Sequence, residues 1–350
     1  MIVLGIESSC DDSAAAVLRD GALAASVVSS QHEVHGPYGG VVPELASREH
    51  VRHVLAVIDG ALGQAGIGLD DVDGIAVTRG PGLVGSLLVG LSVAKGIALR
   101  RALPLVGVHH LEGHMLAVNL ERPVDDPVPH PFLGLIVSGG HSGLYLARAP
   151  GDYVCLGRTR DDAVGEAFDK VAKVLGLGYP GGPAIDRLAR EGNPRAIRFP
   201  RARLKRGRFD LSFSGFKTAV WQYVRDHRPS ERELPDVAAS VQEALVDMLV
   251  DATVEALDET GAERLVVSGG VSANRRLRER MAAMGAERGV EVFVPRPALC
   301  TDNAAMIALA GWRRLAAGED DGLGLDAVAG LPFGVPYDST ETGARERAAH

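Results

Sequence analysis

The sequence contains few cysteines and no segment typical of an exported protein. Its three cysteines, Cys10, Cys155 and Cys300, are too few and too scattered for a disulfide framework, as is usual in a reducing compartment. The N-terminal residues are predicted to enter a β-strand at once, without the basic stretch and apolar core of a secretory signal. We therefore expect a cytoplasmic protein.

Long hydrophobic runs are missing as well. The most apolar stretch, residues 83–99, falls short of the roughly 20 residues that cross a membrane. Lys95 also interrupts this stretch. We expect a buried amphipathic helix at this position and no contact with a membrane.

Positive charge is scarce overall but locally dense. The formal net charge of −8 argues against general binding to nucleic acid. Seven of the fourteen residues from 195 to 208 are nevertheless Lys or Arg, with no acid among them. Such a basic run is either a solvated face or a local contact for a polyanion.

One eight-residue motif occurs twice. Residues 135–142 (LIVSGGHS) and 265–272 (LVVSGGVS) agree at six of eight positions. In each copy a strand-like aliphatic run ends in Ser-Gly-Gly, where missing side chains let backbone N–H groups approach an anion. We interpret the copies as phosphate-binding turns, one in each half, that hold a nucleotide between related domains. Two ordinary strand-to-turn junctions are the alternative.

The chain is long enough for two domains. Each half is predicted to start with strand, turn and strand and then to alternate strands with helices, which indicates mixed sheets covered by helices. The Pro-rich residues 123–131 are the predicted linker, so we place the domains at 1–130 and 131–301. Loops are expected at 32–43 and 179–183, and a flexible polar tail at 337–350.

Two histidines have the spacing of a metal site. His110 and His114 lie four residues apart in HHLEGH, which on a helix places both imidazoles on one face. The zinc-protease pattern fails because Leu111, not Glu, follows His110. Asp302, at the start of a helix predicted over 302–315, is a candidate third ligand, although helix capping is its ordinary role. Two surface histidines are the alternative.

Three further segments carry polar groups at predicted turns. Residues 7–13 (ESSCDDS) connect two strands and could hold a phosphate, with a cation at Asp11 or Asp12. Residues 161–186 combine an amphipathic helix, a Gly-Gly turn and acids that could bind ribose hydroxyls. Residues 213–218 (FSGFKT) either contact a substrate or only pack.

Together these segments resemble the universal tRNA threonylcarbamoyltransferase family, once described as glycoproteases, which has the fold of the actin, Hsp70 and sugar-kinase superfamily. The resemblance covers nearly the whole chain, in the expected order. It implies an α/β protein of two related actin/Hsp70-like (RNase H-like) domains, with mixed sheets, helices on both faces and an active site in the interdomain cleft. The helix near 302–318 would join the first domain. The motifs are GIESSCDDS, HHLEGH, IVSGGHSGLY, GEAFDKVAKVLGLGYPGGPAID, LSFSGFKTAV, VVSGGVSANRRLR and CTDNAA.

The resemblance implies an acyltransferase. A threonylcarbamoyl group would pass from threonylcarbamoyl-AMP to N6 of the adenosine 3′ to the anticodon, in tRNAs that decode codons beginning with A, and AMP would leave. The adenine amine is a weak nucleophile, so a Lewis-acid metal and a rigidly held adenylate are expected. The implied partners are tRNA, a paralogous dimer partner and a small ATPase. A small-molecule kinase of the same superfamily and a non-catalytic scaffold paralogue are the alternatives.

The resemblance also implies roles for individual residues. His110, His114 and Asp302 would bind one divalent metal, Fe²⁺ or alternatively Zn²⁺. From its charge alone, and not from the resemblance, the basic run at 195–208 is expected to contact the tRNA backbone. Asp12 and Ser13 depart from the Glu and Thr of many bacterial members, and Ser142 departs from the usual Thr. The substrate's phosphate or acyl group would meet Ile136, Val137, Ser138, Gly139 and Gly140, and the adenylate would meet Asp169, Gly182, Asp186 and Asn274.

Overall fold

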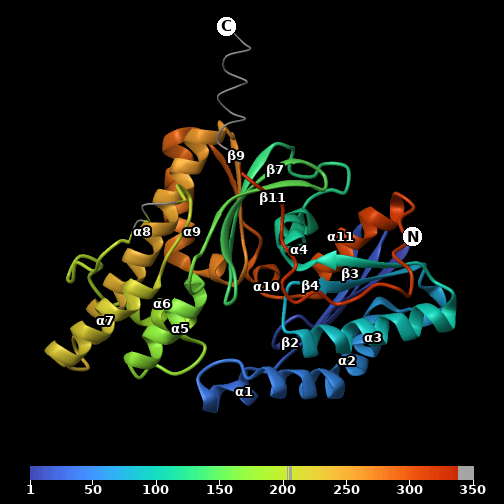
Figure 1. Cartoon of the computed structure of the whole chain (residues 1–350), viewed down its shortest axis with the longest axis horizontal. Helices are drawn as coiled ribbons and strands as arrows, with labels where there is room; N and C mark the ends of the chain where they lie inside the picture. The colour runs from blue at the N-terminus through green and yellow to red at the C-terminus, as the bar shows by residue number, and fades with distance from the viewer. Residues whose placement is uncertain (203, 205–206, 338–350) are drawn as a thin grey trace, which may run out of the picture.

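The computed structural model describes residues 1–202, 204 and 207–337, and within them the strands form two sheets (Figure 1). The first sheet has the order β3-β2-β1-β4-β5, and the second has the order β10-β9-β6-β7-β8-β11. Each half of the chain opens with three antiparallel strands and then adds parallel ones. Both sheets are therefore mixed, as predicted.

The first sheet starts from a tight hairpin. Asp20 and Gly21 both have positive φ, which suits the right-handed twist of the strands that they connect. Side chains along β1 then alternate between the two faces of the sheet. The strands are β1 (Ile2–Glu7), β2 (Asp12–Arg19), β3 (Ala22–Ser30), β4 (Gly74–Gly80) and β5 (Leu105–His109).

Helices cover both faces of the first sheet. Leu4 and Ile6 face α2 (Pro43–Ala65) and α3 (Val84–Arg101), whereas Val3 faces α11 (Ala304–Ala316) from the far end of the chain. A short helix, α4 (His110–Leu116), follows β5 without a loop. The smaller elements are α1 (His32–His35) and the 3₁₀ turns Gly36–Tyr38, Leu69–Asp71 and Ala117–Glu121.

The second sheet is packed differently on its two faces. Leu133, Leu135 and Val137 point into a large core closed by the helices of the second half, and α4 covers the opposite face, where Met115 meets Phe132 and Ile136. The strands are β6 (Phe132–Val137), β7 (Ser142–Ala149), β8 (Asp152–Arg158), β9 (Arg264–Ser268), β10 (Glu291–Phe293) and β11 (Val335–Pro336). The helices are α5 (Val164–Val174), α6 (Gly181–Ala189), α7 (Ser214–His227), α8 (Leu234–Thr260), α9 (Arg275–Arg288) and α10 (Pro297–Cys300), with a 3₁₀ turn at Gly270–Ala273.

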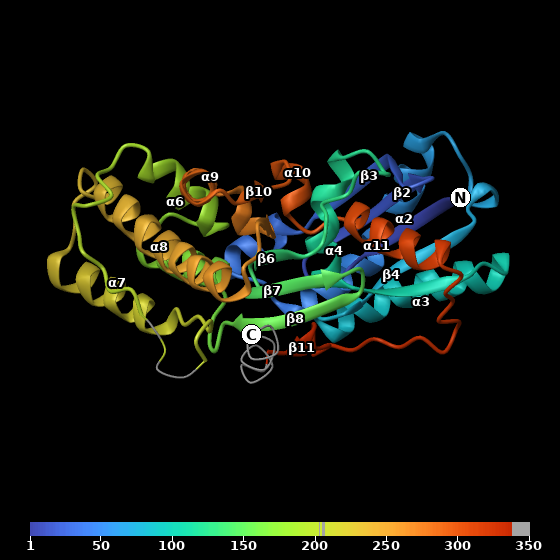
Figure 2. The same cartoon turned by 90° about the horizontal axis from the view of Figure 1, so that it is seen from above.

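The last described residues connect the two sheets. After α11 the chain returns along the first sheet, where Val328 N–H donates to Arg79 O at 2.8 Å. It then crosses to the second sheet and pairs there as β11 with β8, and Figure 2 shows this crossing as the red trace that ends at β11. We call residues 325–337 the C-terminal strap. Apart from Tyr337, the predicted flexible tail lies outside the described residues.

The structure corrects three expectations. The two Ser-Gly-Gly motifs do not lie in different sheets, because β6 and β9 are parallel neighbours, with Leu135 opposite Val267. A repeat in sequence indicates the same local conformation but not the sheet that each copy joins. The predicted loop at 179–183 is also wrong in its second part, since α6 begins at Gly181. The predicted loop at 32–43 contains α1 and a 3₁₀ turn.

Within the described residues, none of the helices is both long and apolar enough to cross a membrane. The stretch 83–99 forms α3, whose buried residues include Leu87, Leu91 and Ala94. Their spacing places them on the helix face toward the first sheet. The predicted amphipathic helix is confirmed.

The packing of α11 on the first sheet can be tested at Gly311. A Cβ on this residue would lie 2.1 Å from the Cβ of Ala76, so we expect Gly311→Ala to destabilise the protein by about 1–3 kcal/mol through overpacking. The matched control is Gly96→Ala on α3, where an added Cβ meets nothing within 4 Å and should stabilise the helix by about 0.5–1 kcal/mol. Urea unfolding midpoints should shift in opposite directions, and equal midpoints for the two variants would contradict this packing.

Candidate active site

The short helix α4 places the side chains of His110 and His114 close together on one face. His110 and His114 are one helical turn apart, both are buried, and their ring centroids lie 4.7 Å apart. Asp302 reaches the same point from the segment before α11. Its Oδ1 lies 3.5 Å from His110 Nε2 and 3.2 Å from His114 Nε2. One ligand atom of each residue falls within 4.8 Å of the other two.

Asp302 is available for this contact because its neighbour performs the capping. The helix predicted from Asp302 begins instead at Ala304, and the side chain of Asn303 accepts a hydrogen bond from Met306 N–H at 3.0 Å. An asparagine fills the N-cap position as well as an aspartate does. The expected alternative role of Asp302 is therefore wrong, and its carboxylate faces the histidines.

A buried carboxylate fixes the orientation of the first histidine. Glu7, at the end of β1, is fully buried and accepts from His110 Nδ1 at 3.0 Å and from Thr78 Oγ1 at 2.7 Å. A proton held on Nδ1 leaves Nε2 free to face Asp302 and a cation. His114 lacks such support, since its buried Nδ1 has no hydrogen-bond partner among the described residues.

The buried charges stabilise one another. Burial opposes protonation of His110, but Asp302 and Glu7 outweigh it and raise the pKa of His110 to about 10. Burial likewise opposes ionisation of Asp302, yet the His110 charge and the hydrogen bonds of both histidines hold the pKa of Asp302 well below its usual range. Burial lowers the pKa of His114. A cation that binds at His110 Nε2 would therefore displace a proton.

The donor set suits a transition metal. Two imidazole nitrogens and one carboxylate oxygen, with room for further ligands, are typical of non-haem Fe(II) sites and of catalytic Zn²⁺ sites. The structure brings together the three residues that the sequence singled out, and their burial excludes the alternative of two surface histidines. Their role as metal ligands stays a prediction.

The first Ser-Gly-Gly turn lies beside this cluster. Ser138 N–H donates to His141 O at 2.7 Å, and His141 N–H donates back to Ser138 Oγ at 3.1 Å. Gly139 and Gly140 are exposed, and a Cβ on either would meet nothing within 4 Å. The His141 ring lies 6.1 Å from that of His110. The turn therefore offers open space next to the histidines.

The other two residues predicted for this turn are buried. The side chains of Ile136 and Val137 are fully inaccessible and belong to cores on opposite faces of the second sheet. Only their main-chain groups could meet a ligand.

The residues predicted to hold the adenylate lie at the starts of α6 and α9 and on α5. Asp169 accepts from Gly181 N–H at 2.7 Å, and burial raises the pKa of Asp169. Gly182 occupies the first turn of α6, and Asp186, one turn later, lies 3.6 Å from Arg190. These residues form one group at the junction of α5 and α6.

The side chain of Asn274 already forms hydrogen bonds within the protein. Its Oδ1 caps α9 by accepting from Leu277 N–H at 3.0 Å, and its Nδ2 donates to Gln242 Oε1 at 2.8 Å. Its proposed contact with a nucleotide therefore depends on lone pairs or main-chain groups that these bonds leave unused.

His50 of α2 holds the turn between β1 and β2 in place by two hydrogen bonds. His50 Nδ1 lies 2.7 Å from Ser13 Oγ, and His50 Nε2 lies 2.9 Å from Cys10 O. Burial, together with the charges of Asp302 and Asp11, raises the pKa of Asp12 to about 7. Asp12 therefore shares the negative potential of the candidate metal site.

Part of the FSGFKT segment packs in the core, whereas Ser214, Gly215 and Thr218 are exposed, so a contact of this segment with a substrate stays a prediction. Phe213 and Phe216 are buried in the second core, and Asp161 accepts from Phe213 N–H at 2.8 Å and from Ser214 Oγ at 2.7 Å. Lys217 forms an ion pair with Asp162. The segment thus begins α7 and ties it to the loop before α5.

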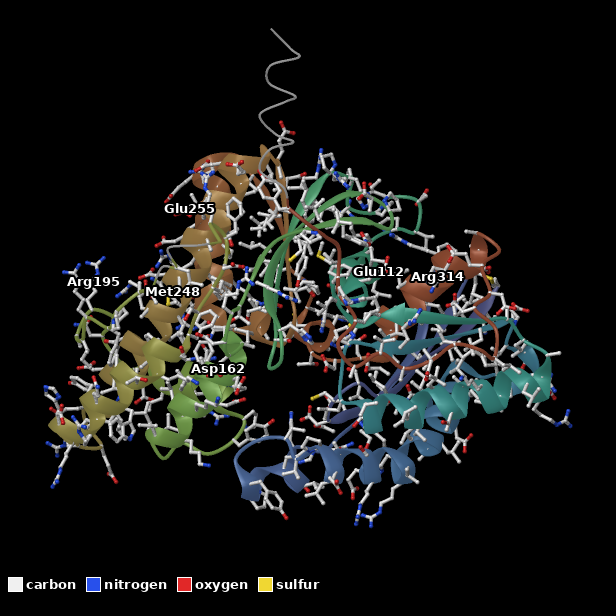
Figure 3. All side chains as sticks on the ribbon, in the orientation of Figure 1. Glu112, Asp162, Arg195, Met248, Glu255 and Arg314 are labelled. Atoms are coloured by element: carbon white, nitrogen blue, oxygen red, sulfur yellow. The ribbon has the colours of Figure 1, made fainter. Side chains whose placement is uncertain are left out.

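The basic run is partly neutralised. Arg201 pairs with Asp247 at 2.6 Å, and Arg208 pairs with Glu259. Arg195 lies on the outer surface of the second half (Figure 3). Residues 203, 205 and 206 lie outside the described residues, so the role of the run in binding tRNA stays a prediction.

Three residues of the cluster have no distinguishing signal in the sequence. Glu7 belongs to a predicted turn, His141 to the repeated motif, and Thr78 to no motif. No sequence signal pairs Glu7 with a histidine 103 residues away, because the contact depends on how β1 and β5 flank β4 in the sheet.

Comparison with known proteins identifies the family of this chain. The family model for tRNA N6-adenosine threonylcarbamoyltransferase matches residues 22–309. The chain belongs to this family. Two relatives bearing that name are similar over nearly their whole length: one from Geobacter sp. (strain M21), 56% identical over 95% of this chain and 97% of its own, and one from Syntrophus aciditrophicus, 53% identical over 96% and 98%. The predicted family is confirmed.

Solved structures support the fold of this threonylcarbamoyltransferase family member. HypF of T. kodakarensis is similar with a TM-score of 0.62, at 14% identity over 91% of this chain and 48% of that chain. The activator of the 2-hydroxyisocaproyl-CoA dehydratase from Clostridium difficile, solved with bound ADPNP, has a TM-score of 0.52, at 16% identity over 91% and 97%. The predicted actin/Hsp70-like α/β fold is confirmed.

The support that Glu7 gives to His110 can be tested by metal titration. We expect Glu7→Gln to weaken binding of Co²⁺, used as a spectroscopic probe, by about 10- to 100-fold, because His110 loses the charged partner of its Nδ1 proton. Thr78→Val is the matched control, since it removes a hydrogen bond to Glu7 but leaves the contact between Glu7 and His110. Equal Co²⁺ affinity of the Glu7→Gln variant and the wild type would contradict this assignment.

Proposed function

We infer that this protein transfers a threonylcarbamoyl group from threonylcarbamoyl-AMP to N6 of the adenosine 3′ to the anticodon, in tRNAs that decode codons beginning with A. The observation that carries the inference is the cluster of two buried histidines, His110 and His114, with the partly exposed Asp302, beside an open Ser-Gly-Gly turn. A cation-binding group beside an anion-binding turn suits a substrate that joins an electrophilic carbonyl to a phosphate.

In the reaction, a bond forms between N6 of adenosine and the carbonyl carbon while the bond from that carbon to the phosphate oxygen breaks. The phosphate oxygen keeps the electron pair and leaves with AMP, and N6 loses a proton. When bound, a divalent metal, Fe²⁺ or alternatively Zn²⁺, would supply a Lewis acid that makes the carbonyl more electrophilic. His110, His114 and Asp302 would hold it, and Glu7 would keep the His110 Nδ1 proton in place.

The remaining candidate residues would orient the substrate. Main-chain N–H groups of Gly139 and Gly140 would hold the phosphate or acyl group. Ser138, whose own N–H donates to His141 O, would shape the turn, and Ile136 and Val137 would support it from within the core. Asp169, Gly182 and Asp186 would hold the adenosine, and Asn274 would shape the second turn by capping α9. Such fixed positioning lowers the entropic part of the barrier.

Several wider features belong to the same proposal. Domains at 1–130, joined by the helix near 302–318, and at 131–301 would place the active site in the cleft between them. A paralogous dimer partner and a small ATPase would act together with this chain, in the cytoplasm. The basic run at 195–208 would contact the tRNA backbone.

The proposal can be tested with the full-length protein, threonylcarbamoyl-AMP, unmodified tRNA and candidate partner proteins. Digestion of the RNA and mass spectrometry should reveal threonylcarbamoyladenosine, and we expect His110→Ala to lower its yield by at least about 100-fold, because removal of a metal ligand removes the Lewis acid. Absence of product with metal-loaded wild type would contradict the transferase assignment. ATP-dependent phosphorylation of a small molecule would then favour the kinase alternative. A wild type with neither activity would favour the scaffold alternative.

A further inference from the structure

The residue just before the metal-binding helix holds that helix by its side chain. His109 is the N-cap of α4, and its Nδ1 accepts from Leu111 N–H at 3.1 Å. Its other nitrogen, Nε2, donates to Leu331 O at 3.2 Å. A neutral imidazole with its proton on Nε2 satisfies both contacts. One side chain therefore links the start of α4 to the C-terminal strap.

The imidazole ring of His109 also packs against an aromatic cluster. Phe333 of the strap lies 4.6 Å from the His109 ring, 5.0 Å from Tyr145 on β7 and 4.7 Å from Tyr153 on β8, measured between centroids. Both tyrosines are almost completely buried. The strap thus inserts an aromatic side chain between the cap of α4 and the second sheet.

A hydrogen bond from the second sheet leads back to α4. Tyr153 Oη donates to Glu112 Oε1 at 3.1 Å, and Glu112 lies on α4, between His110 and His114, near the centre of the molecule (Figure 3). The strap itself is anchored at both ends: Leu325 is buried in the core of the first sheet, and Val335 pairs with Val154 on β8. A Cβ on Gly334 would lie 2.8 Å from Tyr153 O, so the strap lies tightly against β8.

We propose that the C-terminal strap positions the metal-binding helix, through His109 and Phe333, and so sets the distance between the candidate metal ligands and the phosphate turn. His109 and Phe333 are positioning residues, because they act through α4 and the second sheet. The inference rests on the proposed metal role of His110 and His114.

The shortness of α4 makes an external support necessary. A helix of seven residues is too short to be stable alone, because nucleation costs more than its few hydrogen bonds return. Its position must come from contacts at its ends and sides. Glu7 fixes one ring, whereas His109 fixes the first turn of the backbone and joins it to the strap.

The discriminating variant is His109→Asn. Asparagine is a preferred N-cap residue, so it keeps the hydrogen bond to α4, but it cannot also reach Leu331 or stack on Phe333. In the metal-free protein, we expect hydrogen exchange of the α4 amides to become about 3- to 10-fold faster in His109→Asn and in Phe333→Ala. Exchange in α8 should not change. Phe333→Tyr, which keeps the ring, should restore the slow exchange.

The double variant His109→Asn/Phe333→Ala tests whether the two residues act together. We expect its exchange in α4 to be little faster than that of either single variant, because both remove the same link. Tyr337→Phe is the matched control: it removes a hydrogen bond to Glu259 at the far end of the strap, away from α4. Multiplicative effects of the two changes, or equal acceleration in α4 and α8, would overturn the proposal.

Metal binding gives a second measurement. Titration with Co²⁺ should show about 3- to 10-fold weaker binding in His109→Asn and Phe333→Ala, with Tyr337→Phe unchanged. If the wild type itself binds no Co²⁺, the proposed metal centre fails, while the hydrogen exchange of α4 still decides the role of the strap. Unchanged α4 exchange in both single variants would overturn the inference.

Discussion

The buried arrangement of Glu7, His110 and Asp302 is the interaction on which the rest of the structure depends. Glu7 is fully buried and Asp302 keeps only 22% of its side chain exposed, so the two carboxylates would be costly on their own. His110 lies between them, 3.0 Å from Glu7 and 3.5 Å from Asp302. The three residues come from the end of β1, the start of α4 and the segment before α11. The fold of the first sheet, with α11 returning from the far end of the chain, brings these charges together.

The second constraint is that α4 is connected to the first sheet and packs against the second. It continues directly from β5 of the first sheet, yet Leu111 and Met115 pack against the second. Gly134 on β6 permits this approach, since a Cβ there would lie 2.2 Å from Met115 Sδ. The Ser-Gly-Gly turn at the end of β6 therefore lies beside the histidines, because both pack around the same helix.

Local features of the sequence predicted much of this architecture. The spacing of His110 and His114 predicted one helical face, alternating apolar residues predicted the strands, and quoted motifs identified the family. Contacts between distant segments were not predictable, because Glu7 meets His110, and Phe333 meets His109, only through sheet order and chain return. That the two Ser-Gly-Gly turns follow neighbouring strands was not predictable for the same reason. Asn303 took the capping role expected of Asp302 because neighbouring polar residues compete for one N-cap.

The adjacency of β6 and β9 sets how far apart the two glycine-rich turns lie. Leu135 of β6 lies opposite Val267 of β9, so both turns emerge from the same edge of one sheet. A slip of one residue in this pairing would move one turn past the other by about 3.3 Å. The register of two buried strands is therefore a dimension of the candidate binding site.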